Sequence, residues 1–419
     1  MGSETFGRGE ALLAGAARFE RKPGLIARLI APQFHRILDT IDRGLEYGSI
    51  RGILPDGSTR LLGGRNPGFE TDIHLRDWRG VMRLATNGSI GWYQAWEAGE
   101  WDSPDPVPVF ALFNVNAKWL GDTGRAKGPF RMLARFAHWL NRNSHTGAQR
   151  NIQAHYDLGN DFYAQWLDPT MSYSSAMFAE GDNLEAAQRR KWARLGERLG
   201  LNDSGEPETV LEIGCGWGSL ADYLAGRGAK VTAISLSEEQ LAWAREHHSP
   251  AIDFRKQDYR DVAELVDAIV SVEMVEAVGR EYWPSYFDCI ADNLKPGGRA
   301  AIQYISMADW MFEDYARSAD FIQAYIFPGG LLIRTSEFQR LAAERGLSWE
   351  DQEDFGLDYA ETLKIWRENF DTAVSEGRLP DGFDDRFARL WRFYLMYCEG
   401  GFRGRGIDVH QVTLVKQTV

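Results

Sequence analysis

The chain has few cysteines, no long apolar run and a deficit of positive charge. Its three cysteines, Cys215, Cys289 and Cys398, are too few and too widely spaced for a disulfide framework or a zinc cluster. No run of 18 apolar residues occurs, and the N-terminus has no uninterrupted apolar core of the signal-peptide type. We therefore expect reduced thiols, no metal site and a cytoplasmic location.

The net charge of −13 is distributed unevenly along the 419 residues. Residues 1–150 hold 20 Lys and Arg against 15 Asp and Glu, whereas residues 151–419 hold 27 against 45. The acidic part would repel a phosphate backbone, which argues against nucleic acid as a partner. A composition of 44% hydrophobic and 12% aromatic residues supports well-packed cores, and the length allows two or three domains.

One segment runs against the acidic trend. Residues 123–150 contain six bases and no acid, and their apolar side chains Phe130, Leu133, Phe136, Ala137 and Leu140 fall on one helical stripe. A basic amphipathic helix of this kind can lie on an anionic membrane. It can equally pack its apolar stripe on the protein's own core and leave its bases in solvent, so both interpretations stay open.

The pattern of apolar residues predicts two parts of different architecture. Residues 1–140 are typical of a small α+β domain, with a helix at 24–45 interrupted by Pro32, and the polar stretch 141–153 is predicted to be a linker. From 154 to 419 strands alternate with helices, which predicts an α/β domain with a mostly parallel, doubly wound sheet that binds its ligand at the carboxyl ends of the strands. The predicted strands of this sheet are 210–213, 230–234, 253–256, 267–272 and 299–304.

The first of these strands runs into a glycine-rich turn. Gly214, Gly216 and Gly218 lie between the strand and the helical pattern that Leu220 opens, where backbone must pass close to a ligand. A dinucleotide fingerprint needs G-x-G-x-x-G, but the third glycine comes one position early. The observed G-x-G-x-G, preceded by Glu212, resembles the S-adenosylmethionine loop of class I methyltransferases. A tight turn without a ligand is the plain alternative.

The ends of the next two strands add candidate binding residues. An NAD-dependent enzyme would place an acid after the second strand, but this chain has Ser235 and Leu236, with Gln240 in the following helix. A hydroxyl and an amide are therefore predicted to bind a ribose. Asp258 closes the third strand, where it would meet the adenine amino group, although an acid in such a loop can simply be solvated.

Several longer segments resemble one family in the same order along the chain. They are HYDLGNDF (155–162), LDPTMSYSSA (167–176), EIGCGWGSLA, QDYRD, SVEMVEAVG (271–279), LKPGG, YIFPGG (325–330) and FRGRGIDVHQV (402–412). They closely resemble the cyclopropane fatty acid synthases and mycolic acid methyltransferases. The resemblance implies a Rossmann-like class I methyltransferase fold and S-adenosylmethionine as cofactor, and it adds Tyr173 and Ser174 to the cofactor-binding residues.

What the resemblance implies about the reaction is methyl transfer to the double bond of an unsaturated phospholipid acyl chain, followed by closure of a cyclopropane. The aromatic stretch 321–333 then becomes a candidate wall for an acyl tunnel. The enzyme would act at the inner face of the membrane as a peripheral protein. A homodimer is left open.

The base site is where the chain departs from the family. In the family, a bicarbonate ion is held by a Cys backbone amide, a Glu, a His and a Tyr. The matching positions in this chain are Ser175, Glu276, Gln303 and Tyr394. Two of the four differ, so bicarbonate binding stays open, and Glu276 could itself be the base or simply an acid near the start of a helix. A rebuilt base site would also suit methylene- or methyl-branched or furan-precursor products made with a partner oxidoreductase. A non-catalytic lipid-binding protein is the alternative from another class.

Overall fold

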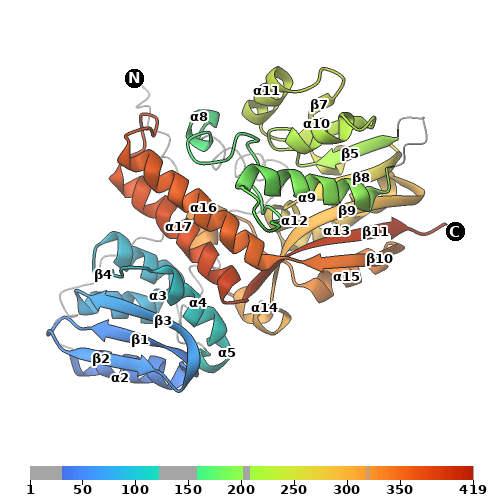
Figure 1. Ribbon diagram of the computed structural model, residues 1–419. Helices are drawn as coiled ribbons and strands as arrows, with labels where there is room; N and C mark the ends of the chain where they lie inside the picture. The colour runs from blue at the N-terminus through green and yellow to red at the C-terminus, as the bar shows by residue number, and fades with distance from the viewer. Residues whose placement is uncertain (1–30, 122–157, 202–207, 319, 419) are drawn as a thin grey trace, which may run out of the picture. The chain divides into compact units, whose positions relative to one another are not determined.

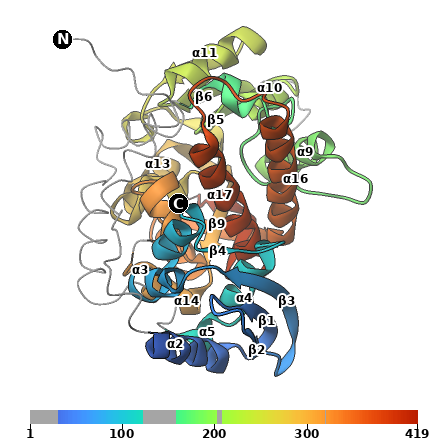
Figure 2. The same ribbon diagram turned by 90° about the vertical axis from the view of Figure 1, so that its left-hand side faces the viewer.

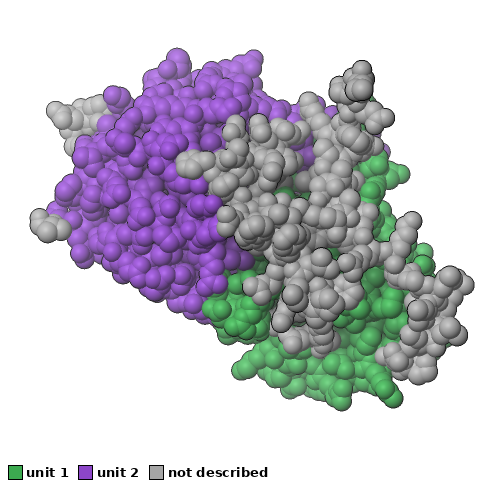
Figure 3. All heavy atoms as spheres, turned by 180° about the vertical axis from the view of Figure 1, so that it is seen from behind, with its two compact units in different colours: residues 1–141, 310–328, 381–407 green, residues 142–309, 329–380, 408–419 purple. Residues whose placement is uncertain are grey.

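The computed structural model describes residues 31–121, 158–201, 208–318 and 320–418. Contacts divide the chain into two compact units (Figure 3). Unit 1 comprises residues 1–141, 310–328 and 381–407, and unit 2 comprises residues 142–309, 329–380 and 408–419. This division differs from the predicted domains 1–140 and 154–419, because two segments of the C-terminal part belong to unit 1. The predicted linker 141–153 and the basic segment 123–150 lie outside the described residues.

Unit 1 contains a small mixed sheet with strand order β2-β1-β3-β4, in which β1 and β3 are parallel and the other pairs antiparallel. Figure 2 shows α2 and α5 beside this sheet. The α+β character predicted for the N-terminal residues is thus observed. The elements are α2 (Ala31–Gly44), β1 (Tyr47–Ile53), β2 (Thr59–Gly63), β3 (Asn66–Leu75), α3 (Trp78–Glu97), β4 (Trp101–Asp102), α4 (Val107–Val115), α5 (Ala117–Leu120), α14 (Asp309–Tyr315), the π-helix η5 (Ile322–Ile326) and α17 (Asp385–Arg403).

An aromatic core explains why two late segments of the chain belong to unit 1. Tyr93 of α3 lies with its ring centroid 5.0 Å from Phe321, 4.6 Å from Tyr325 and 5.2 Å from Phe393. All four side chains are buried. Large aromatic rings gain stability from burial and from such tilted and edge-to-face contacts. This long-range packing, which no local pattern specifies, takes residues 310–328 and 381–407 out of the predicted continuous methyltransferase domain.

Unit 2 is built on a seven-stranded sheet with order β10-β11-β9-β8-β5-β6-β7 (Figure 1). The pairs β5/β6, β5/β8, β6/β7 and β8/β9 are parallel, and β10/β11 is antiparallel. A mostly parallel α/β sheet was the prediction, and it is confirmed. The strands are β5 (Thr209–Ile213), β6 (Lys230–Ser235), β7 (Asp253–Lys256), β8 (Val266–Val272), β9 (Leu294–Met307), β10 (Leu347–Asp354) and β11 (Ile407–Lys416).

Helices accompany this sheet (Figure 1), and both ends of α9 follow sequence signals. Asn183 caps the start of α9 by accepting a hydrogen bond from Ala186, and Gly200 ends the helix in a left-handed conformation with φ +68°. In the described ranges every helix is too short or too polar to span a lipid bilayer. The helices are α8 (Asn160–Tyr163), α9 (Leu184–Leu199), α10 (Ser219–Ala225), α11 (Glu238–His247), η3 (Tyr259–Asp261), α12 (Val275–Val278), η4 (Arg280–Tyr282), α13 (Trp283–Asn293), α15 (Thr335–Ala343) and α16 (Gly356–Ser375).

The order of the strands fixes where a ligand can bind. The chain places β6 on one side of β5 and β8 on the other, so the connections after β5 and β8 leave the sheet in different directions. In open α/β sheets such a switch point opens a crevice at the carboxyl ends of the strands. The glycine-rich turn follows β5 directly, and therefore lies at this crevice.

Candidate functional site

A cavity of about 160 Å³ opens at the carboxyl ends of β5, β6 and β8. Its walls come from the glycine-rich turn, the start of α11, the loop after β7, the turn after β8 and the segment before α9. The turn brings backbone N–H groups to the start of α10, as a nucleoside-bearing ligand requires. All ten residues predicted to bind the cofactor line it: Tyr173, Ser174, Glu212, Gly214, Gly216, Gly218, Ser235, Leu236, Gln240 and Asp258.

The three glycines of the turn have positive φ angles but different surroundings. A Cβ on Gly214 would lie 2.3 Å from Met274 Sδ, and one on Gly218 would lie 2.8 Å from the Phe254 ring. A Cβ on Gly216 would meet no protein atom within 4 Å, although this residue also has φ +53°. Gly214 and Gly218 are therefore required by packing within the fold, whereas Gly216 leaves space on the pocket side.

Neutral polar groups stand where a ribose is predicted to bind. Ser235 Oγ donates to Gln240 Oε1 over 3.3 Å, and Ser237 caps α11. Asp258 is buried and forms a 2.6 Å ion pair with Arg260, so it is not the solvated carboxylate that the loop alone would allow. Its contact with adenine stays a prediction.

Glu212, the acid before the turn, is buried at the end of β5. Its Oε2 has no hydrogen-bond partner among the described residues. Burial raises the pKa of this carboxyl to about 8. An unpartnered buried carboxyl oxygen at a cavity wall is suited to receive a donor from a ligand.

Glu273, which the sequence reasoning did not single out, is the centre of the second half of the site. It directly follows β8 and lines the cavity. Its Oε1 accepts hydrogen bonds from the Ser175 backbone N–H and from Gln303 Nε2, each over 2.9 Å, and its Oε2 accepts one from the Tyr359 hydroxyl over 2.8 Å. Two of the groups predicted to hold a free anion therefore hold this carboxylate.

The backbone at Glu273 is unusual for a glutamate. Its φ angle is +52°, a left-handed conformation that side chains other than glycine rarely adopt. Its N–H donates to the Gln303 carbonyl over 2.8 Å, which ties the turn to β9. Burial raises the pKa of the Glu273 carboxyl above its ordinary value of 4.5, and the hydrogen bonds from Ser175, Gln303 and Tyr359 oppose that rise. The only sequence signal was an acid immediately after a strand of the sheet.

Gln303 is fixed in one orientation by its neighbours. Its Oε1 accepts a 3.0 Å hydrogen bond from Gln411 Nε2, and its Nε2 donates to Glu273 and, over 3.3 Å, to the Ser175 carbonyl. The amide therefore presents its N–H groups to Glu273.

The other two predicted catalytic residues, Glu276 and Tyr394, have surroundings of their own. Glu276 is on α12; its Oε1 accepts from the Ile305 N–H, its Oε2 is buried without a partner among the described residues, and burial raises its pKa to about 8. It is not among the residues that line the cavity. Tyr394 is on α17 in unit 1, with its ring 5.1 Å from Trp391 and 6.2 Å from Phe327. The catalytic roles of both stay predictions.

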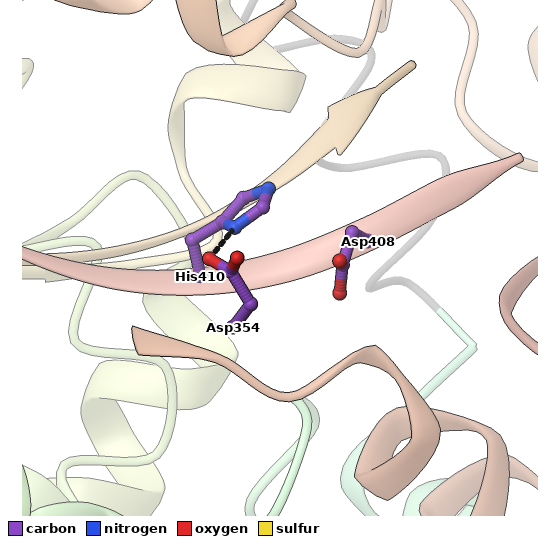
Figure 4. A group of neighbouring side chains, drawn as sticks. All are labelled: Asp354, Asp408 and His410. Atoms are coloured by element: carbon purple, nitrogen blue, oxygen red, sulfur yellow. Dashed lines mark hydrogen bonds and ion pairs between the residues drawn. The ribbon is translucent and has the colours of Figure 1, made fainter. Parts of the chain in front are cut away.

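Three ionisable side chains near the junction of β10 and β11 could offer ligand atoms to a metal ion within 4.8 Å of one another: Asp354, Asp408 and His410 (Figure 4). His410 Nδ1 already lies 2.6 Å from Asp354 Oδ1, and its Nε2 lies 2.7 Å from Ser306 Oγ. Asp408 Oδ1 accepts from the Gly356 and Val409 N–H groups. The group therefore fastens β11 to β9 and to the start of α16 through protein contacts.

The sheet with its glycine turn and carboxyl-end cavity defines a class I S-adenosylmethionine-dependent methyltransferase. A search with sequence profiles of families agrees, because residues 143–412 match the family described as mycolic acid cyclopropane synthetase. The chain belongs to this family, as the resemblance predicted, and it is an S-adenosylmethionine-dependent enzyme.

Two curated relatives cover most of the chain. The tuberculostearic acid methyltransferase UfaA1 of Mycobacterium tuberculosis is 38% identical over 80% of this chain and 81% of its own length. The cyclopropane-fatty-acyl-phospholipid synthase of Escherichia coli is 34% identical over 83% of this chain and 88% of its own length.

Solved structures give the same result. The cyclopropane synthase MmaA2 from M. tuberculosis has a TM-score of 0.58 with 29% identity, and the mycolic acid cyclopropane synthase CmaA1, complexed with S-adenosylhomocysteine (SAH) and CTAB, has 0.59 with 28%. Each alignment covers 64% of this chain and 98% of the known one.

Proposed function

We propose that this enzyme transfers a methyl group from S-adenosylmethionine to the double bond of an unsaturated acyl chain in a phospholipid, and that Glu273 accepts the proton lost afterwards. The observation that carries the proposal is the hydrogen-bonded Glu273 carboxylate in the wall of the cofactor cavity. The family membership and the relative named cyclopropane-fatty-acyl-phospholipid synthase support the choice of an acyl substrate.

The reaction needs a positioned alkene and a base. The π electrons of the alkene attack the methyl carbon of the sulfonium, the S–C bond breaks, and its electron pair returns to sulfur, which leaves a carbocation on the other alkene carbon. Removal of a proton from the new methyl group then lets the C–H electrons close a cyclopropane ring. Because an alkene is a weak nucleophile, the protein must align it at near-attack distance and exclude water.

Glu273 is suited to receive that proton. Its burial raises the pKa of the carboxyl, so the carboxylate is more basic than one in water. The Ser175 N–H, Gln303 and Tyr359 all donate to it, and these donors hold the carboxylate in one position. An acid kept at φ +52° despite the backbone strain is consistent with a functional requirement.

In this proposal bicarbonate is not required. The resemblance implies an anion held by the groups at Ser175, Glu276, Gln303 and Tyr394, but Ser175 and Gln303 donate to the side chain of Glu273 instead. The carboxylate thus supplies, within the chain, the anion that these donors would otherwise take from solution. Glu276 and Tyr394 stay candidate catalytic residues in the proposal, but neither is the base.

A second candidate product is a methylene- or methyl-branched chain, made with a partner oxidoreductase where the branch is reduced. It is favoured by the rebuilt base site and by the relative named tuberculostearic acid methyltransferase. After the same methyl transfer, a hydride shift moves the cation to the methylated carbon, and loss of a methyl proton gives a methylene group. The first chemical step is common to both products.

The remaining parts of the proposal concern location and partners. We propose that the enzyme acts as a peripheral protein on the cytoplasmic face of the membrane, and the six bases in residues 123–150 support this through attraction to anionic lipid. A homodimer stays open. A cofactor pocket filled by a side chain would have supported the alternative of a non-catalytic lipid-binding protein, and the open cavity speaks against that alternative.

The test is a product analysis. The purified enzyme is incubated with S-adenosylmethionine and vesicles of phosphatidylglycerol and phosphatidylethanolamine that carry one defined monounsaturated chain. We expect a gain of one CH2 per modified chain, dependent on the double bond, because saturated vesicles offer no π electrons. Cyclopropane and methylene products have equal mass and are separated by ozonolysis, which cleaves only the alkene. Unmodified unsaturated chains in the presence of bound cofactor would contradict the proposal.

A further inference from the structure

A lysine is buried in the wall of the cofactor cavity. Lys191 of α9 is 1% exposed and lines the cavity. Its Nζ donates to Ser174 Oγ over 2.6 Å, and no carboxylate of the described residues forms an ion pair with it. Ser174 and Lys191 are 17 positions apart in sequence, so the loop before α9 and the helix itself meet at this point.

An unpaired buried ammonium requires an explanation, since removing a charge from water without a partner is strongly unfavourable. Lys191 has three N–H donors and uses one of them within the described chain. Burial lowers the pKa of its ammonium to about 8, while the negative charges of Glu273, Asp168 and Glu212 oppose that fall. These three acids influence the lysine without lying at ion-pair distance, so a closer anion would hold it in the charged form.

The same cavity also contains a buried acidic group. Glu212 Oε2 is buried, lines the cavity and has no partner among the described residues. A buried ammonium without an ion-pair partner and a buried carboxyl oxygen without a hydrogen-bond partner among the described residues, in one cavity, are complementary to a zwitterion. The methionine part of S-adenosylmethionine ends in such a zwitterion, with one α-carboxylate and one α-ammonium group.

We propose that Lys191, together with Ser174, binds the α-carboxylate of S-adenosylmethionine, and that Glu212 faces its α-ammonium group. Lys191 is then a positioning residue, because anchoring the amino-acid end fixes where the sulfonium methyl points. The proposal rests on the cofactor of the proposed function but not on its acyl substrate. The competing role for Lys191 is to keep Glu273 ionised, which would act on the chemical step and not on cofactor affinity.

The experiment is a double-mutant-type thermodynamic cycle, in which a substitution in the protein is combined with removal of a group from the ligand. Calorimetry measures the affinity of wild-type protein and of Lys191→Met for three ligands without acyl lipid. The ligands are SAH, its decarboxylated analogue, which keeps the amino group, and 5′-methylthioadenosine, which lacks the whole amino-acid part. Lys230→Met is the control, because it makes the same substitution on an exposed residue of β6 outside the cavity.

We expect Lys191→Met to weaken SAH binding by roughly 10- to 100-fold, as for loss of a charged hydrogen bond, and to leave 5′-methylthioadenosine within about 3-fold. The decarboxylated analogue should bind wild-type protein about as weakly as SAH binds the variant, and the two losses should not add. With increasing pH the affinity of wild-type protein for SAH should fall more steeply than that of the variant, since the lysine loses its proton.

Three results would overturn the proposal. The first is additive losses in the cycle, and the second is an equal loss for all three ligands, which would mean general damage to the pocket. The third is unchanged SAH affinity with a reduced kcat, which would mean that Lys191 acts by keeping Glu273 ionised. If Lys191→Met does not unfold cooperatively, Lys191→Gln, which can still bond to Ser174, replaces it. Wild-type protein that binds SAH but modifies no acyl chain would refute the proposed function alone.

Discussion

Replacement of Glu273 tests the central chemical proposal. Two substitutions remove the charge in different ways. Glu273→Gln keeps the shape, so its Oε1 can still accept from the Ser175 N–H and from Gln303. Glu273→Gly removes the whole side chain and leaves these two donors and the Tyr359 hydroxyl facing an empty space, while the φ angle of +52° is one that glycine adopts readily.

The magnitudes follow from these contacts. If the carboxylate is the base, its loss should lower kcat by roughly 100-fold or more in both variants. In Glu273→Gly each unsatisfied buried donor costs about 1–3 kcal/mol of stability. Relief of the strained backbone recovers about 1–3 kcal/mol. The glycine variant should therefore remain folded, and SAH affinity should change little in either protein.

Rescue by an added anion separates the two variants. In Glu273→Gly the vacated space and its donors should admit bicarbonate or formate, and activity should rise with the concentration of the anion. Glu273→Gln is the matched control, since its amide fills the same space and should prevent rescue. The assay measures conversion of monounsaturated vesicles with isotopically labelled S-adenosylmethionine in carbonate-free buffer with and without added bicarbonate.

The pH dependence provides an independent check. The base acts in its ionised form, so the rate should fall as pH drops through the pKa of Glu273, which burial raises above 4.5. The acidic limb of the wild-type profile should lie above that value and should disappear in Glu273→Gln. Full activity of Glu273→Gln, or wild-type activity that depends on added bicarbonate, would refute the assignment of Glu273 as the base.

Three further predictions concern other parts of the chain. Gly216→Val should reduce SAH affinity by at least about 10-fold, because its side chain would enter the cavity, whereas Gly228→Val, at φ +91° and likewise without protein atoms within 4 Å, should keep wild-type affinity in the same calorimetric measurement. Glu276→Gln should lower turnover less than Glu273→Gln, since the Glu276 carboxyl bonds to the Ile305 N–H; the reverse order in a steady-state assay would restore Glu276 as the base. Binding to anionic vesicles in a sedimentation assay should weaken with salt and with Arg131→Glu and Arg135→Glu, and equal binding to neutral vesicles would remove electrostatics from the proposal.

Local sequence patterns determined much of the cofactor half of the site. The apolar strand before Gly214 and the helix after Leu220 are specified within a few residues, and so is the alternation of strands and helices that gives a parallel sheet. The predicted strand 253–256 matches β7, and the other four predicted strands of the sheet match observed strands to within a few residues at their ends. All ten predicted cofactor residues line one cavity because the carboxyl ends of parallel strands meet at one edge of the sheet.

Tertiary structure decided the groups whose partners are distant in sequence. Glu273 meets Ser175 across 98 positions and Tyr359 across 86, in a left-handed backbone conformation that its residue type disfavours. Lys191 lacks an ionic partner only because the fold buries it at the cavity wall. In the same way, aromatic packing around Tyr93 assigns residues 310–328 and 381–407 to unit 1. Helix and strand periodicity is local, whereas burial and long-range pairing depend on how the whole chain folds.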